Sequence, residues 1–115
     1  MYAETIQPSF ITETPHLEAK NDKINDVLDE LPPIMRKIAE CESRSRHWDD
    51  KGEVLIGHMT PDIGLFQISP YWHGKEAKKL GIDIYSLEGN AEYATILYKK
   101  NGTKDWNASE DCWNK

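Results

Sequence analysis

The sequence predicts a mostly helical α+β domain, on the evidence of two kinds of segment. Three stretches carry apolar residues at the spacing of an amphipathic helix, and two short runs rich in apolar and β-branched residues flank a turn. The chain has 115 residues, of which 38% are hydrophobic and 30% charged, which is the size and composition of one globular domain. We therefore expect one core within residues 22–115.

The N-terminal part divides into a tail and a first helix. Residues 1–21 are polar and contain Pro8 and Pro15 without a sustained period, so we expect a tail or linker there. Asp22 is a suitable N-cap for a short helix over residues 22–31. Its apolar face would comprise Ile24, Val27, Leu28 and Leu31.

A second helix is expected over residues 33–44, because proline is well tolerated in the first helical turn and Pro33 can begin it. At 100° per residue, the side chains of Ile34, Ile38, Cys41 and Glu42 fall on one side. Glu42 thus lies at the end of an apolar stripe.

A small β lobe and two further helices are expected next. Residues 54–58 and 63–68 would form a hairpin around the turn at 59–62. A short helix over 75–80 would close at Gly81, and a stronger one over 87–101 would end at Gly102. The remaining residues, 104–115, carry Trp106, Cys112 and Trp113 and should fold back on the core.

Charge and composition exclude several classes of function. The net charge of −6 does not favour nucleic acid or anionic membranes, and no apolar run approaches the about 18 residues that span a bilayer. The histidines show no metal-binding spacing with Asp or Cys and should lie at the surface or a cleft edge. We expect a monomer that needs no metal or other cofactor.

The two cysteines, Cys41 and Cys112, favour one disulfide between the second helix and the tail, in an oxidising compartment. The alternative is two buried free thiols in a cytosolic protein. The disulfide interpretation predicts an extracytoplasmic protein, whether periplasmic, cell-wall or secreted, whose signal peptide is not present in this chain.

Glu42 is the candidate proton donor. A carboxylic acid can protonate a glycosidic oxygen near neutral pH only if its pKa is raised, and apolar neighbours raise it by desolvation. The alternative is an ordinary surface glutamate on a helix.

A second motif favours the catalytic interpretation. Asp62 offers a second carboxylate, Gly64 permits close approach of the backbone, and Gln67 carries a donor and an acceptor suited to an N-acetylated sugar. Alternatively, this segment is a strand, and Asp62 after Pro61 is a routine turn residue.

These motifs, in order, resemble the lysozyme-like superfamily, particularly bacterial lytic transglycosylase (SLT) domains. The resemblance covers about residues 34–113 and rests on Glu42-Ser43, then Gly64-Leu65-Phe66-Gln67-Ile68, then Asn90 with Ala94 and Leu97. It implies a helical lobe, a small β-hairpin lobe and a cleft between them that binds peptidoglycan. Glu42 would be the catalytic acid. Among the substrate-binding residues, Ser43 would support the Glu42 region, and Gly64 and Gln67 would shape the site and contact the sugar.

The tail instead resembles animal-type lysozymes, with Trp106-Asn107-Ala108-Ser109 and then Cys112-Trp113. Asp62 stands where such lysozymes carry their second catalytic carboxylate, so both a hydrolase and a transglycosylase remain open. Tyr71, Trp72 and Tyr98 are further candidate glycan contacts, since aromatic faces suit the C–H surface of a sugar, although each could equally be packing.

The sequence therefore predicts cleavage of the β-1,4 bond between MurNAc and GlcNAc. The acidic surface keeps an alternative open, a non-catalytic glycan- or partner-binding module on the same fold.

Overall fold

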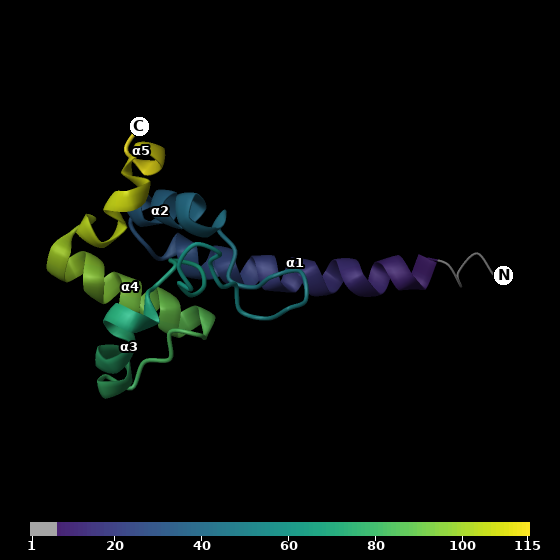
Figure 1. Cartoon of the computed structure of the whole chain (residues 1–115). Helices are drawn as coiled ribbons and strands as arrows, with labels where there is room; N and C mark the ends of the chain where they lie inside the picture. The colour runs from purple at the N-terminus through teal and green to yellow at the C-terminus, as the bar shows by residue number, and fades with distance from the viewer. Residues whose placement is uncertain (1–6) are drawn as a thin grey trace.

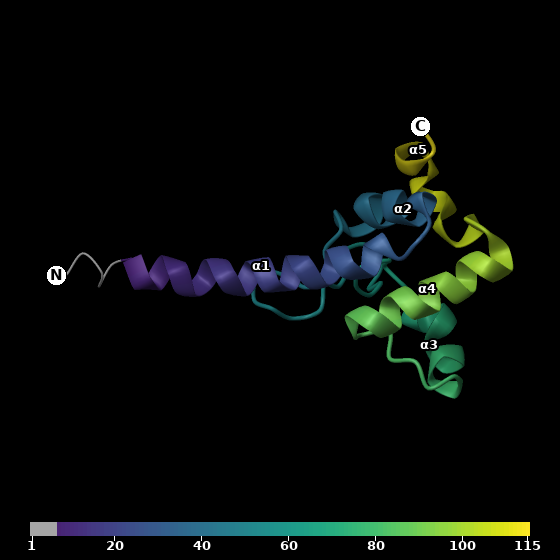
Figure 2. The ribbon, with the colours of Figure 1, turned by 180° about the vertical axis from the view of Figure 1, so that it is seen from behind.

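The computed structural model describes the backbone of residues 7–115 and the side chains of residues 18–115. The chain forms five α-helices and a 3-10 helix in this part. In chain order they are α1 (Gln7–Asp29), α2 (Pro33–Ser43), α3 (Pro70–Lys79), α4 (Leu87–Asn101), η2 (Lys104–Ser109) and α5 (Glu110–Trp113). The N-terminal part of α1 extends away from a body formed by the other elements (Figures 1 and 2).

The first helix begins well before the expected N-cap at Asp22, which lies inside α1. Pro8 lies in the first turn of α1, where a proline destabilises a helix little. The expectation that Pro8 marks an irregular tail is therefore wrong. From Lys20 onward the helix contacts the body, because the Lys20 ammonium lies 5.1 Å from the centre of the Trp48 ring. Residues 1–6 of the expected tail lie outside the described residues, and the domain boundary at residue 22 stays a prediction.

The expected helices at 33–44 and 87–101 are confirmed as α2 and α4. A proline begins α2, and its buried face includes Met35, Ile38 and Ala39. The side chain of Ser86 caps α4 by accepting a hydrogen bond from the Gly89 amide. Local capping signals and the helical period together account for both elements.

Helix α3 begins at Pro70, earlier than the expected residue 75. Ser69 is its N-cap and accepts a 3.3 Å hydrogen bond from the Trp72 amide. A serine followed by a proline is a combined N-cap and first-turn signal, and the sequence interpretation overlooked it. As a result, Tyr71, Trp72 and His73 belong to a helix.

The expected strands of the hairpin are wrong as continuous strands, since residues 7–115 contain only isolated bridges. One bridge, between Ile56 and Ile63, retains the expected antiparallel pairing. Residues 63–68 form a closed turn in which the Ile63 and Ile68 amides each donate to the other's carbonyl, at 2.8 and 2.9 Å. The turn arises because Gly64 and Gln67 have φ values of 71° and 49°, which an extended strand does not allow.

The C-terminal tail folds back on α2, as expected. A disulfide joins Cys41 to Cys112, 71 positions apart. The indole of Trp106 donates to the Phe66 carbonyl at 3.0 Å, and that of Trp113 donates to the Trp106 carbonyl at 3.1 Å. The tail is thus tied both to the helix that carries Glu42 and to the turn.

Within the described residues, every helix is too short or too polar to cross a bilayer.

Candidate functional site

Glu42 is half-buried near the C-terminal end of α2, with its carboxylate facing the tail. Burial raises the pKa of Glu42, and the negative charge of Asp62 adds to this effect. The hydroxyl of Ser109 donates a 2.6 Å hydrogen bond to Oε2 of Glu42 and opposes part of the rise, because it stabilises the carboxylate. Glu42 therefore has the setting of a proton donor.

Ser109 can serve Glu42 in both protonation states. Its single hydroxyl proton bonds the ionised carboxylate, but the hydroxyl also lies 3.2 Å from the Trp106 carbonyl. When Glu42 is protonated, Ser109 can accept from it and donate to that carbonyl instead. Sequence reasoning missed Ser109, and the only signal that could have found it is the disulfide, which holds the tail against α2.

Three buried polar side chains hold the turn at 63–68, which follows Asp62. We call these side chains, Ser43, His47 and Asn90, the clamp. Ser43 donates to the Leu65 carbonyl at 2.7 Å, and the Leu65 amide donates to Nδ1 of His47 at 3.1 Å. Asn90 accepts from the Phe66 amide at 2.8 Å and donates to the carbonyls of Ile63 and Ile84, each at 2.8 Å. Side chains distant in sequence therefore satisfy the backbone of the turn.

His47 corrects the expectation that the histidines lie at the surface or a cleft edge. It is fully buried, and burial lowers its pKa because the charged form is desolvated. Its Nδ1 accepts from the Leu65 amide, so in the neutral ring Nε2 carries the proton and donates to the Tyr85 carbonyl at 2.9 Å. The ring is a structural part of the clamp.

Two predicted substrate contacts, Ser43 and Gly64, are buried against protein groups. The Ser43 hydroxyl bonds backbone groups, and a Cβ on Gly64 would lie 2.5 Å from Cε1 of His47. The close approach that Gly64 permits is thus to His47. Both residues therefore support the turn from the protein interior.

A cavity of about 640 Å³ lies beside the turn and α3. Its wall includes four of the predicted site residues, namely Asp62, Gln67, Tyr71 and Trp72. Glu42 and Tyr98 are not among the residues that line it. Tyr98 is half-buried and packs against the core.

Asp62 and Gln67 occupy the turn side of this cavity. Asp62 accepts a 2.7 Å hydrogen bond from Thr60, and the amide of Gln67 donates to the Gly64 carbonyl at 3.0 Å. Gln67 also holds a left-handed backbone conformation, with φ of 49°, which is uncommon for a residue other than glycine. Such strain concentrates at functional sites, where the surrounding structure over-determines the conformation.

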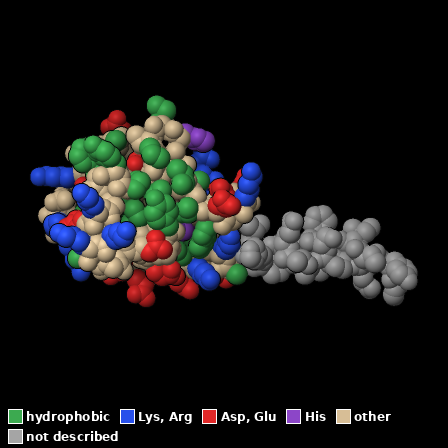
Figure 3. Space-filling view, turned by 60° about the horizontal axis from the view of Figure 1, so that its bottom comes forward, with side chains coloured by type: hydrophobic (Ala, Val, Ile, Leu, Met, Phe, Trp, Pro, Cys, Tyr) green, Lys and Arg blue, Asp and Glu red, His purple; other side chains and the backbone are tan. Residues whose placement is uncertain are grey.

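Tyr71 and Trp72 form the exposed aromatic wall. Their side chains are 83% and 76% exposed, and the rings meet edge to face with centroids 4.9 Å apart. Figure 3, in which the lower side of the molecule in Figure 1 comes forward, shows hydrophobic side chains gathered near the middle of that side, with acidic and basic side chains around them. Large aromatic side chains left in water beside a cavity suit a ligand with an apolar face.

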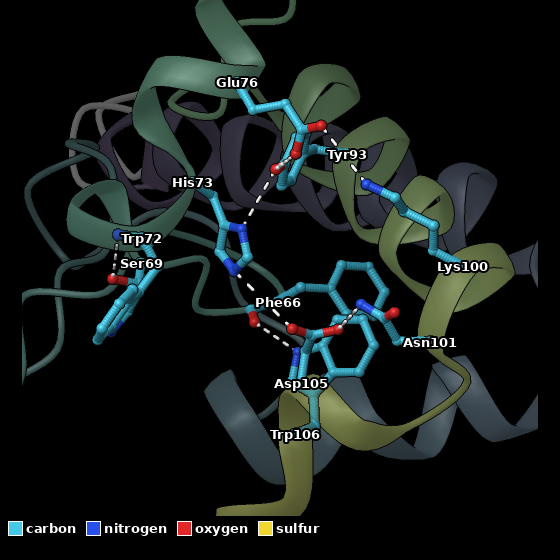
Figure 4. A network of polar contacts seen from close by, with 10 residues as sticks. All are labelled: Phe66, Ser69, Trp72, His73, Glu76, Tyr93, Lys100, Asn101, Asp105 and Trp106. Atoms are coloured by element: carbon cyan, nitrogen blue, oxygen red, sulfur yellow. Dashed lines mark hydrogen bonds and ion pairs between the residues drawn. The ribbon is translucent and has the colours of Figure 1, made fainter.

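A polar network that sequence reasoning missed completes the wall (Figure 4). It joins α3, α4 and η2, and it places His73 and Asp105 in the lining of the cavity. The periodicity of the helices could not reveal it, because its members come from three separate elements.

Among the described residues, His, Cys, Asp and Glu side chains form no cluster of three with the geometry to hold a metal ion. No protein-family model matches the chain, and comparison with curated proteins and with solved structures finds no significant match either.

Proposed function

We propose that this protein cleaves peptidoglycan strands at the β-1,4 bond between MurNAc and GlcNAc, with Glu42 as the general acid and base, on a lysozyme-like fold. The observation that carries the proposal is the half-buried Glu42, whose pKa is raised by burial and whose carboxylate is hydrogen-bonded by Ser109. A glycosidic oxygen is a poor leaving group until it is protonated, so an acid poised in this way supplies what the reaction needs.

Asp62 leaves two reaction courses open. The negative charge of Asp62 contributes to the raised pKa of Glu42, and a retaining hydrolase would use such a second carboxylate to form or stabilise the glycosyl intermediate. In a lytic transglycosylase Glu42 would act alone, first as acid and then as base toward the sugar's own 6-hydroxyl. The ability of Ser109 to serve both protonation states of Glu42 suits either course.

Analysis of the muropeptides released from purified cell wall tests the proposal. Products with 1,6-anhydro ends would identify a transglycosylase, and reducing ends a hydrolase. Intact glycan strands after incubation with folded protein between pH 4 and 8 would contradict both.

A second candidate is a glycan-binding module without turnover, and one observation favours it. The exposed aromatic pair Tyr71 and Trp72 lines the cavity, whereas Glu42 does not. Binding of glycan strands with no bond cleavage would select this candidate.

The disulfide supports an extracytoplasmic site of action, because such bonds persist in oxidising compartments. We propose the periplasm, the cell wall or the medium as the place where this chain meets its glycan, acting as a monomer.

A further inference from the structure

The polar network beside the cavity contains two hydrogen-bond acceptors that face each other (Figure 4). It connects six side chains, in the order Lys100, Glu76, Tyr93, His73, Asp105 and Asn101. The positions of the protons along this series determine what the cavity wall offers to a ligand.

The inner part of the network fixes the proton on Nδ1 of His73. The single hydroxyl proton of Tyr93 is donated to Oε1 of Glu76 at 2.8 Å. Glu76 remains an acceptor, because the bond from Tyr93 and then the charge of Lys100 lower its pKa. The Tyr93 oxygen must therefore accept the 3.2 Å contact with Nδ1 of His73, which carries a hydrogen.

The outer nitrogen of a neutral His73 is consequently an acceptor. It lies 3.9 Å from Oδ1 of Asp105, beyond hydrogen-bonding distance, and two acceptors cannot bond each other. The other carboxylate oxygen of Asp105 is already bonded by the Asn101 amide at 3.1 Å. Nε2 of His73 and Oδ1 of Asp105 thus receive no hydrogen bond from any described residue.

Both acceptors belong to side chains that are 22% exposed and that line the cavity. Neither lysine nor arginine is among the residues that line this cavity, so no cation of the cavity wall donates to these two acceptors. A gap of this width between two acceptors suits neighbouring donors on one ligand, each bonding one acceptor.

We propose that His73 and Asp105 form a subsite that binds ring hydroxyls of a glycan, next to the stacking surface of Trp72. The glycan as ligand rests on the proposed function. Adjacent hydroxyls on a sugar ring are neutral donors at close spacing, and the C–H face of the same ring suits the exposed indole. Tyr93 acts here as a positioning residue, because its hydroxyl holds His73 in the required tautomer.

Binding of the chitin tetrasaccharide, measured by calorimetry in a Glu42→Gln background, tests the subsite without turnover. His73→Phe keeps a ring but removes both nitrogens, and we expect the Kd to rise about tenfold for the loss of one hydrogen bond to a ligand. Asp105→Ala should raise the Kd at least as much. His58→Phe is the matched control, because His58 is exposed and does not line the cavity, and its Kd should not change.

The ¹⁵N spectrum of His73 gives an independent readout that does not depend on the variants folding. We expect the neutral ring to carry its proton on Nδ1 and not on Nε2, and we expect the Nε2 signal to shift when the tetrasaccharide binds. A neutral His73 ring that carries its proton on Nε2, or an Nε2 signal that does not move when ligand binds, would overturn the subsite. A tetrasaccharide that binds equally well to His73→Phe and Asp105→Ala would overturn the subsite alone, whereas absence of binding to the parent protein would overturn the proposed glycan function as well.

Discussion

The turn at 63–68 and the aromatic wall of Tyr71 and Trp72 on α3, called the α3 wall below, both line the cavity, but they differ in how their groups are satisfied. In the turn, the buried side chains of Ser43, His47 and Asn90 form hydrogen bonds with the backbone. In the α3 wall, Tyr71 and Trp72 face water. The difference indicates that the hydrogen bonds of the turn hold its backbone in one conformation, whereas the exposed side chains of the α3 wall are accessible to a ligand.

Removing the clamp should have the largest effect on stability. Asn90→Ala leaves the Phe66 amide and the Ile84 carbonyl without partners, and it removes one of the two hydrogen bonds to the Ile63 carbonyl. We expect the free energy of unfolding to fall by about 4 kcal/mol, as measured by urea denaturation. Asn114→Ala is the matched control, because its side chain bonds only Glu110 on the surface, and it should cost less than about 0.5 kcal/mol. A similar loss of stability in both variants would contradict the stabilising role of the clamp.

Crowding the turn should have the next largest effect. Gly64→Ala combines a left-handed backbone with a Cβ within 2.6 Å of Nδ1 of His47, so we expect a loss of about 3 kcal/mol. Gly81→Ala has nearly the same φ, 72°, but open space around the new Cβ, and should lose about 1 kcal/mol. Equal losses would mean that contact with His47 contributes nothing.

The hydrogen bond to Glu42 can be separated from its burial by a pH titration. Ser109→Ala removes the one contact that favours the carboxylate, so the pKa of Glu42 should rise further and any high-pH limit of activity should move to higher pH. The ¹³C signal of the Glu42 carboxyl reports this titration directly, and Ser109→Thr should restore it.

Ser45→Ala is the matched control for this titration, because Ser45 donates to the carboxylate of Glu40 on the surface at 2.9 Å. The Glu42 titration should be the same in this variant as in the parent. A Glu42 pKa unchanged by Ser109→Ala would show that the Ser109 contact does not form in solution.

The α3 wall should show the smallest effect on folding. Trp72→Ala removes a side chain that is mostly in water, so the free energy of unfolding should change by no more than about 0.5 kcal/mol while glycan affinity falls. A stability loss comparable to that of Asn90→Ala would mean that the wall supports the fold after all.

Local signals predicted the parts of the fold that depend on local chemistry. The apolar period and the terminal signals of Pro33 and Gly102 predicted α2 and α4. The turn was mistaken for a strand because Ile63 to Ile68 is apolar, while the left-handed Gln67 carries no sequence signal. Its conformation depends on clamping side chains from distant parts of the chain.

The candidate site was predictable only in part, for the same reason. Glu42 was identified from its place at the end of an apolar stripe, and the bond from Ser109 was missed because 67 residues separate them. The acceptor pair of His73 and Asp105 was missed because the donor directions around Tyr93 appear only in three dimensions. A sequence motif can point to a candidate proton donor, whereas the side chains that contact it are seen only in the fold.

Cleavage of purified peptidoglycan by the wild-type protein and by Glu42→Gln tests the central claim most directly. Because burial penalises the charged form of Glu42, its contribution to stability is lost as pH rises through its folded pKa, and the neutral glutamine should not weaken the fold at pH 7. We therefore predict that Glu42→Gln remains folded and releases no muropeptides under conditions in which the wild type does. Equal release by both proteins would contradict the assignment of Glu42 as the proton donor.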